Sequence, residues 1–345
     1  MIKPLLQEAF LLKTKGYYKH SIETFYKALE IDNNSLELLL EIADCYYLMN
    51  ETERAINYIE QVLEKNPTHI DSLRLLKKIF VSKEAWEQSI QTAQNIYLIT
   101  QKDEDLADIM SLLNKVGHYD EILAYEKHDS HPQIMYEKAF AKFMQKDYEN
   151  ALHYIENALK ICNEDKEFLL LKGKILFKLN RKSECIALAE MFDEENENPD
   201  VCNFIALINQ YEQNYKKALE YFSKAIKLAP KHDEYYYNKA STYFKMGDSQ
   251  AAKHYYNLAI SLSPENQNYH FALANLFYSE KQYKRALEEL DYDFFEARLL
   301  KSIILYDSGY LAIAKKELET LKNEEPENEI ICEYTRRIED ELRLS

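Results

Sequence analysis

The sequence predicts an all-α fold, an α–α superhelix of about ten helix–turn–helix repeats followed by a C-terminal capping helix. Small residues recur at a nearly constant spacing with helical apolar patterns around them, and the 345 residues include only 5 glycines and 7 prolines. The repeated positions are Ser21, Ala55, Ser89, Ile122, Ala151, Cys185, Ala218, Ala252, Ala286 and Ala314. Their gaps are 34, 34, 33, 29, 34, 33, 34, 34 and 28 residues, a period typical of a solenoid.

One repeat can be followed from Asp233 to Asn266. Its first helix is expected to place Tyr236, Ala240 and Tyr243 on a core face, and its second helix Ala252, Tyr256 and Ala259. Both sets follow the i, i+4, i+7 spacing of one helical face. Gly247 opens the turn between the helices, and Pro264 ends the second helix because proline cannot continue it. The small residue allows the two helices to cross closely, and neighbouring repeats must stack to bury their apolar faces.

This pattern resembles the tetratricopeptide repeat, which has large residues and a small one in its first helix and alanine, an aromatic residue and proline in its second. The pattern recurs at Gly16, Tyr17, Ser21, Phe25 and Ala28, at Ala55, Ile59, Val62 and Pro67, and at Tyr215, Ala218, Phe222, Ala225 and Pro230. The resemblance covers about residues 2–326. It implies that partners lie in a concave groove lined by the first helix of each repeat.

Two repeats are shorter than the others, by an amount that exceeds one helical turn. We therefore expect a short second helix and a change of superhelical direction near Ser130–Pro132 and again near Asp291–Asp293. These places divide one continuous solenoid into residues 1–131 with repeats 1–4, residues 132–294 with repeats 5–9, and residues 295–345 with repeat 10 and the cap. The segment 328–343 alternates apolar and charged residues, as expected of a helix that covers the last open face.

The charge balance limits the classes of partner. The chain has 43 basic and 59 acidic residues, a net charge of −16, so nucleic acid is not expected because a phosphate backbone requires a basic stripe. A field of this sign steers a basic partner, although it also serves solubility alone. No stretch approaches the ~18 apolar residues of a membrane-spanning helix, so no membrane insertion is expected. Five scattered cysteines indicate reduced thiols in a cytoplasmic protein.

Catalytic and cofactor-binding motifs are not found in the sequence. It contains no phosphate-binding glycine loop, no dinucleotide fingerprint, no nucleophile elbow and no H-E-x-x-H zinc motif. His128 and His131, with Asp129 between them, supply too few ligands for a closed zinc site. Because the repeats use nearly all residues, we expect no catalytic residues, no cofactor and no metal, and the protein is not expected to be an enzyme.

The groove is expected to be lined by the face of each first helix that lies one residue beyond its core face. The candidate partner-binding residues are Tyr136, Phe140, Asn203, Tyr237, Asn238, Phe244, Phe271, Asn275, Tyr278 and Tyr306. The aromatic members would anchor a partner, because buried aromatic residues dominate binding energy, and the asparagine amides would hold an extended backbone. The alternative is that some of these aromatic side chains pack internally.

The leading functional hypothesis is a non-catalytic scaffold that binds a peptide or protein partner, either basic or apolar, in this groove. The alternatives are a self-assembling homo-oligomeric protein and the regulatory subunit of a separately encoded enzyme. Some members of the family bind the C-terminal carboxylate of chaperones through a clamp of lysine, asparagine and arginine. Along repeats 7 to 9 only Asn238 fits that pattern, so such a clamp is disfavoured there.

Overall fold

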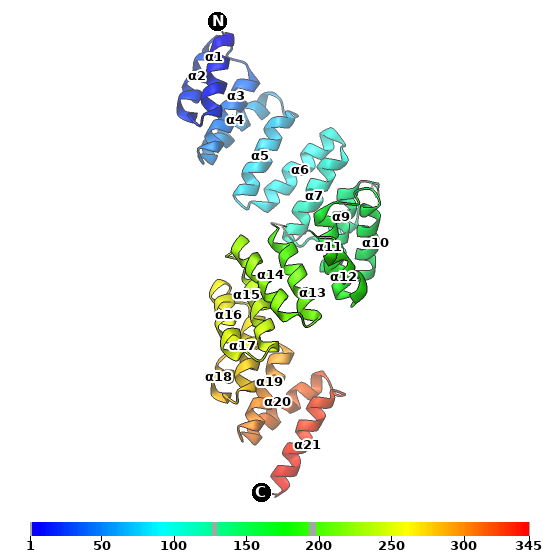
Figure 1. Ribbon diagram of the computed structural model, residues 1–345. Coiled ribbons are helices and arrows are strands. Elements are labelled where there is room, and N and C mark those ends of the chain that lie inside the picture. Colours follow the sequence, from blue (N-terminus) through cyan, green and yellow to red (C-terminus); the bar gives the residue numbers. More distant parts are fainter. Residues whose placement is uncertain (1, 126–129, 193–197, 345) are drawn as a thin grey trace. The chain divides into compact units, whose positions relative to one another are not determined.

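The computed structural model describes residues 2–125, 130–192 and 198–344. Over these residues it contains 21 α-helices and no strand, which confirms the all-helical repeat fold (Figure 1). The chain forms two compact units, Met1–Arg181 and Lys182–Ser345. The division between them falls in the turn between the two helices of the sixth repeat. The domain boundaries expected after residues 131 and 294 stay predictions.

The first unit contains five helix pairs and the first helix of a sixth. Its helices are α1 (Ile2–Thr14), α2 (Tyr18–Ile31), α3 (Leu36–Leu48), α4 (Thr52–Lys65), α5 (Ile70–Ser82), α6 (Trp86–Thr100), α7 (Asp103–Val116), α8 (Tyr119–Leu123), α9 (Pro132–Met144), α10 (Tyr148–Leu159) and α11 (Lys166–Lys178). Apolar clusters join each pair to the next, for example Phe25 and Ala28 of α2 with Leu38 and Ile42 of α3. Each repeat therefore shares its core with its neighbours, as expected of a solenoid.

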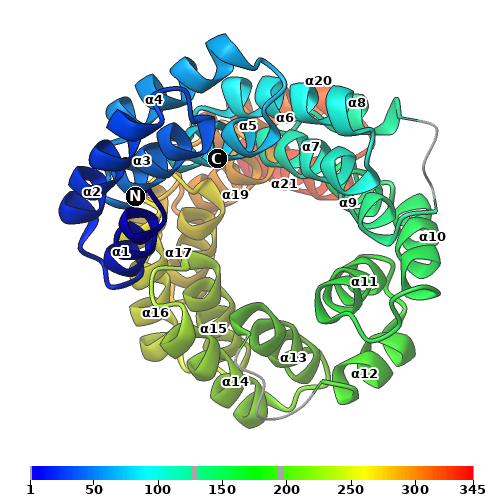
Figure 2. The ribbon, with the colours of Figure 1, turned by 90° about the horizontal axis from the view of Figure 1, so that it is seen from above.

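The second unit begins with α12, the second helix of the sixth repeat along the sequence, and ends with the cap. Its helices are α12 (Lys182–Glu190), α13 (Pro199–Tyr211), α14 (Tyr215–Leu228), α15 (Asp233–Lys245), α16 (Ser249–Leu262), α17 (Gln267–Ser279), α18 (Tyr283–Glu288), α19 (Phe295–Asp307), α20 (Leu311–Glu324) and α21 (Glu329–Leu344). Figure 2 shows the first helices α13, α15 and α17 along one side of this unit and the second helices α14 and α16 along the other. One side of this unit is thus formed by first helices and the other side by second helices.

The ten repeated small-residue positions are all buried. Their exposed fraction is 0% at nine of them and 2% at Cys185. Five residues before each of them, the backbone is left-handed, with φ between 55° and 84°. These turn residues are Gly16, Asn50, Glu84, Gly117, Lys146, Asn180, Gln213, Gly247, Lys281 and Gly309. The turn and the helix crossing therefore form one unit of fixed length that recurs through the chain.

The first shortened repeat has a second helix, α8, of only 5 residues, whereas the other second helices of this unit have 12 to 15. This confirms the short helix predicted from the spacing. The following helix α9 packs directly against α7, and Ile134 and Ala141 join Leu106 and Met110 in one apolar cluster. Helix α9 therefore provides part of the cover that a full second helix would give.

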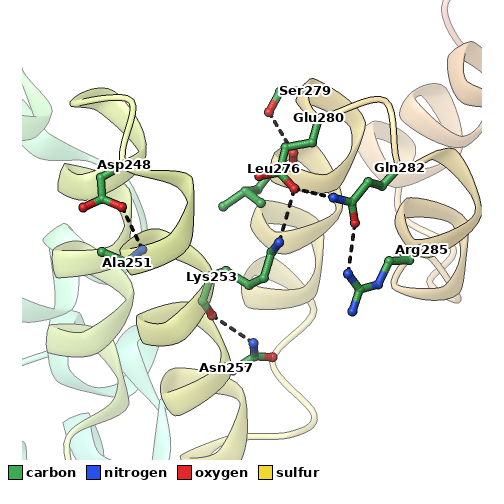
Figure 3. Close-up of polar contacts among 9 residues, drawn as sticks. All are labelled: Asp248, Ala251, Lys253, Asn257, Leu276, Ser279, Glu280, Gln282 and Arg285. Carbon is green, nitrogen blue, oxygen red and sulfur yellow. Dashed lines mark hydrogen bonds and ion pairs between the residues drawn. The ribbon is translucent and has the colours of Figure 1, made fainter.

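The second shortened repeat confirms the other expected short helix, since α18 has 6 residues while α14, α16 and α20 have 14. A chain of polar contacts fixes its start (Figure 3). Glu280 accepts from Lys253 Nζ of α16 at 3.2 Å and from Gln282 Nε2 at 2.8 Å, and Gln282 accepts from Arg285 Nη1 at 3.0 Å. After α18, Leu290 is fully buried, and Tyr292 and Phe294 pack against the same core.

The last helix, α21, confirms the predicted cap. Its residues Ile331 and Ile338 are fully buried and join Leu318 and Leu321 of α20 in one cluster. The other faces of α21 are mostly charged, so the helix closes the apolar end of the tenth repeat with a polar surface.

Candidate functional site

The first helices of the second unit bury more of their circumference than the sequence pattern predicted. In α15, Tyr235, Asn238 and Thr242 are buried beside Ala240, while Tyr236 and Tyr243, expected in the core, are only half-buried. The reason is that α15 contacts α13 and α14 of the preceding repeat as well as its own partner α16. Side chains between successive first helices are therefore part of the interior.

Tyrosine–carboxylate hydrogen bonds connect successive first helices. Tyr235 Oη donates to Asp200 at 2.7 Å, and Tyr269 Oη donates to Asp233 at 2.9 Å. Each aspartate lies in the first turn of its helix, where the positive end of the helix dipole stabilises its charge. Burial, with the carboxylate adding to it, raises the pKa of both tyrosines well above the ordinary value. Both phenols therefore stay neutral donors, and the helices are held in a fixed register.

Two of the candidate aromatic residues make the same kind of bond near the other end of the first helices. Tyr278 Oη of α17 donates to Asp307 at 2.7 Å, and Tyr306 Oη of α19 donates to Glu341 of α21. The ring of Tyr306 also meets Tyr334 edge-on, with centroids 5.3 Å apart. Both rings are half-buried and fixed in position.

Tyr237 and Phe271, which were expected either to line the groove or to pack internally, mostly pack internally. Tyr237 stacks on Tyr269 with centroids 5.0 Å apart and contacts Tyr256 at 5.8 Å, and Phe271 meets Phe294 at 5.5 Å. Burial raises the pKa of Tyr237. Both residues therefore take part in the core of this unit, and each leaves only a minor part of its surface open.

Phe244 is the most open of the candidate aromatic residues in this unit, with 37% of its surface exposed. Tyr211, which sequence reasoning missed, is 40% exposed at the end of α13, and Lys182 Nζ lies 4.6 Å from the centre of its ring. Each lies in the last turn of its helix. Tyr211 was missed because it lies eight residues after Asn203, off the i, i+4, i+7 spacing by which the groove face was chosen.

The candidate asparagines Asn203 and Asn238 are brought together between α13 and α15. Asn238 Nδ2 donates to Asn203 Oδ1 at 3.1 Å, and both residues are more than nine-tenths buried. Within the described part of the chain, Asn203 Nδ2 and Asn238 Oδ1 have no partner, yet neither is sealed from solvent. One free donor and one free acceptor thus lie at the edge of this helix pair. Asn275 differs, because its Nδ2 donates to Phe271 O of its own helix at 3.0 Å.

A polar network adjoins the asparagine pair. Gln210 Nε2 donates to Thr242 Oγ1 at 2.8 Å and to the backbone oxygen of Asn238 at 3.4 Å, and Gln210 Oε1 accepts from Lys245 Nζ at 3.0 Å. These bonds fix the backbone that carries Asn238. The bonded residues are 28 to 35 positions apart in the sequence, so no local pattern could reveal the bonds. The occurrence of asparagine, glutamine and threonine at positions expected to be apolar was the only sign of a polar network.

Tyr136 and Phe140, the other two candidate residues, belong to α9 in the first unit. Tyr136 stacks on Phe168 of α11 with centroids 5.0 Å apart, and Phe140 is half-buried. The eight candidates from Asn203 to Tyr306 lie in the second unit, and the structure therefore defines a candidate site only for them.

The loop residues that were considered as metal ligands lie mostly outside the residues that the structure describes. His128 and Asp129 lie outside the described residues, and His131 precedes α9. Among residues 2–125, 130–192 and 198–344, no three His, Cys, Asp or Glu side chains gather where they could hold a metal ion. In the same residues no helix is long and apolar enough to cross a membrane.

The paired helices, the left-handed turn and the buried small residue define an α-solenoid repeat protein. The chain contains tetratricopeptide repeats, since profiles of this repeat match residues 16–79, 199–232 and 233–266. A TPR repeat-containing protein of Methanocaldococcus jannaschii is 24% identical over 242 residues, which are 69% of this chain and 34% of that protein. A DnaJ homolog subfamily C member 3 homolog of Dictyostelium discoideum is 23% identical over 64% of this chain and 42% of that protein.

The matched segments span about a third to two fifths of the length of these relatives. Among solved structures, the APC/C hetero-tetramer Cut9–Hcn1 contains a chain that superimposes with a TM-score of 0.62. The match covers 97% of this chain and 75% of that one at 11% identity, which is a likeness of fold alone.

Proposed function

We propose that the protein is a non-catalytic scaffold that binds an extended peptide of a protein partner across α13 and α15. The asparagine pair carries this proposal. Asn203 Nδ2 and Asn238 Oδ1 offer one donor and one acceptor on side chains that are otherwise buried, and each residue of an extended peptide presents one N–H and one C=O. Because both atoms reach solvent, they can bond a peptide backbone in exchange for water.

Open aromatic rings near the asparagine pair support the same function. Phe244 and Tyr211 lie at the ends of the two helices that carry the pair, and each exposes more than a third of its surface. Aromatic side chains held by a rigid scaffold bind at little cost in conformational entropy, and they dominate interface energies. The asparagines would therefore position the backbone, while Phe244 and Tyr211 would bind its side chains.

The test begins with a random 12-residue peptide library displayed on phage and selected on the full chain. The dissociation constants of enriched peptides are then measured by calorimetry. We expect Phe244→Ala combined with Tyr211→Ala to weaken binding by about 2 kcal/mol or more. The matched control is Leu228→Ala combined with Leu262→Ala, which removes two equally exposed apolar side chains from the second helices of the same unit.

Backbone recognition has its own readout. Methylating the peptide nitrogens one at a time should abolish the contact at one central residue, where Asn238 Oδ1 accepts. Equal affinities for both double variants, or no effect of any methyl group, would contradict the proposed site. Concentration-dependent dimers that vanish in the Phe244/Tyr211 variant would instead favour the self-assembly alternative.

A further inference from the structure

A second surface lies in the first unit, on helices that the proposed peptide site does not use. A hollow of about 590 Å³ lies against α6, α7 and α8, and its lining includes Trp86, Ile90 and Leu113 with the carboxylates of Glu87 and Glu121. The volume falls within the ~300–1,000 Å³ of typical ligand pockets. Trp86 is the only tryptophan of the chain, and it is half-buried against the apolar cluster that contains Leu113.

One face of α6 continues from the hollow along the helix, and the hollow together with this face is named the α6 groove. Glu87, Gln91, Gln94 and Leu98 follow the i, i+4, i+7, i+11 spacing of a single helical face. Leu98 is 69% exposed, more than any other large apolar side chain among the described residues. Helix α8, which supplies Glu121 to the hollow, is only 5 residues long. The face spans about 16 Å, the length of roughly 11 helical residues at 1.5 Å each.

The charges around the groove are mainly acidic. Helix α6 contains Glu87 and no basic residue. Glu121 pairs with His118 at 2.9 Å, and Lys115 Nζ lies 5.7 Å from the centre of the Trp86 ring. An apolar floor with acidic sides complements a partner helix that is apolar on one face and basic beside it.

We propose that this groove binds an amphipathic helix of a partner protein, with leucine-like side chains on Trp86 and Ile90 in the hollow, a further apolar side chain against Leu98 on the adjoining face, and lysine or arginine beside Glu87 and Glu121. A helix is the element that fits, because the open face has the length of about three turns and its neighbours are helices. An apolar helix face laid into such a groove is a common recognition mode. The carboxylates select the basic sequence against an acidic one.

Trp86 provides the readout, because its fluorescence reports the groove without a label. The probe is an acetylated and amidated 14-residue peptide of leucine and lysine with helical amphipathic spacing. It is titrated into the full chain with excitation at a wavelength selective for tryptophan. We expect a saturable change of Trp86 emission and no change with the matching leucine–glutamate peptide.

Charge-reversal variants test where the probe binds. Glu87→Lys combined with Glu121→Lys should weaken binding about tenfold or more, since 1.4 kcal/mol corresponds to a factor of ten. The control Glu60→Lys combined with Glu64→Lys makes the same change of net charge on α4 and should leave the affinity within a factor of two. Far-UV circular dichroism verifies that all variants are folded.

Three results would overturn the proposal: no saturable change of Trp86 emission, equal loss in both charge-reversal variants, or equal binding of the leucine–glutamate peptide. Emission that changes with protein concentration alone, together with a dimeric mass, would assign the groove to a second copy of the chain and also overturn it. The peptide site on α13 and α15 is tested by other variants, so either proposal can fail alone.

Discussion

The two shortened repeats leave a first helix partly uncovered, and each is covered in a different way. At the first, α9 lies directly on α7 and brings the carboxylate of Glu137 into the interior, only 5% exposed. At the second, Leu290, Tyr292 and Phe294 alternate inward while Asp291 and Asp293 stay exposed. In residues 290–294 every second side chain points inward, so polar residues can alternate with apolar ones and stay exposed. Helix α9 also belongs to the next repeat, so the face that it turns toward α7 includes the polar residue Glu137.

The difference has an energetic consequence. Asn114 Nδ2 donates to Glu137 Oε2 at 2.7 Å and to its backbone oxygen at 3.0 Å, and this fixes the orientation of the amide. Asn114 Oδ1 is then buried with no partner among the described residues. Glu137 is hydrogen-bonded by amides alone, with Gln133 as the other donor. The first junction therefore buries polar groups that the second avoids, and buried groups of this kind are destabilising.

The largest expected effect is at the second junction. Leu290→Ala should lower the free energy of unfolding by about 2–5 kcal/mol, because it removes a fully buried side chain that α18 cannot replace. Urea titration followed by circular dichroism measures the loss, and hydrogen exchange should place it in α17 to α19. The control Leu262→Ala removes a side chain that is 39% exposed and should cost far less. Equal losses would show that residues 290–294 do not cover the core.

A middle-sized effect separates shortened from complete repeats. Ile122 occupies the small-residue position of α8 and is fully buried, which indicates that a short second helix tolerates a larger side chain there. Ala252→Ile in the complete α16 should therefore cost about 1–3 kcal/mol through overpacking. Ala286→Ile in the short α18 should cost less than half as much. Thermal melts of the two variants decide this, and equal shifts would contradict the explanation.

The smallest effect concerns charge at the first junction. Burial raises the pKa of the Glu137 carboxyl, and Glu167 and Asp108 add repulsion, against the lowering effect of the Asn114 and Gln133 amides. Because the folded-state pKa lies above the unfolded one, ionisation destabilises the fold, and stability is recovered as the pH falls through the folded-state pKa. Glu137→Gln should therefore stabilise the chain by about 1 kcal/mol at neutral pH.

That advantage should disappear near pH 4, where the unfolded carboxyl, with a pKa of about 4.3, is also protonated. Urea titrations at both pH values measure it. The control Glu104→Gln changes an exposed carboxylate on the neighbouring α7 and should stay within about 0.5 kcal/mol at either pH. A Glu137→Gln gain that is the same at pH 4 and pH 7 would exclude ionisation as its cause.

The repeat architecture was predictable because its signals are local. The spacing of Ser21 to Ala314 revealed every helix pair, and the gaps before Ala151 and Ala314 revealed both short second helices. The contacts that could not be predicted are hydrogen bonds between residues about one repeat apart, such as Tyr235 and Asp200. Three successive tyrosines at 235–237 gave no periodicity to choose the buried one. Asn203 and Asn238 were each expected at the site, but their pairing depends on how α13 and α15 pack.

The left-handed turns offer several positions at which the protein could be stabilised by substitution. Six of the ten turn positions hold residues other than glycine, namely Asn50, Glu84, Lys146, Asn180, Gln213 and Lys281. Replacing one of them by glycine would relieve steric strain and gain up to roughly 1 kcal/mol after the entropy cost of glycine is subtracted. In a solenoid each repeat interacts mainly with its neighbours, so distant substitutions should add nearly independently. Substitutions at Asn50, Lys146, Asn180 and Lys281, which do not adjoin Trp86 or Tyr211, could thus raise thermal stability in graded steps.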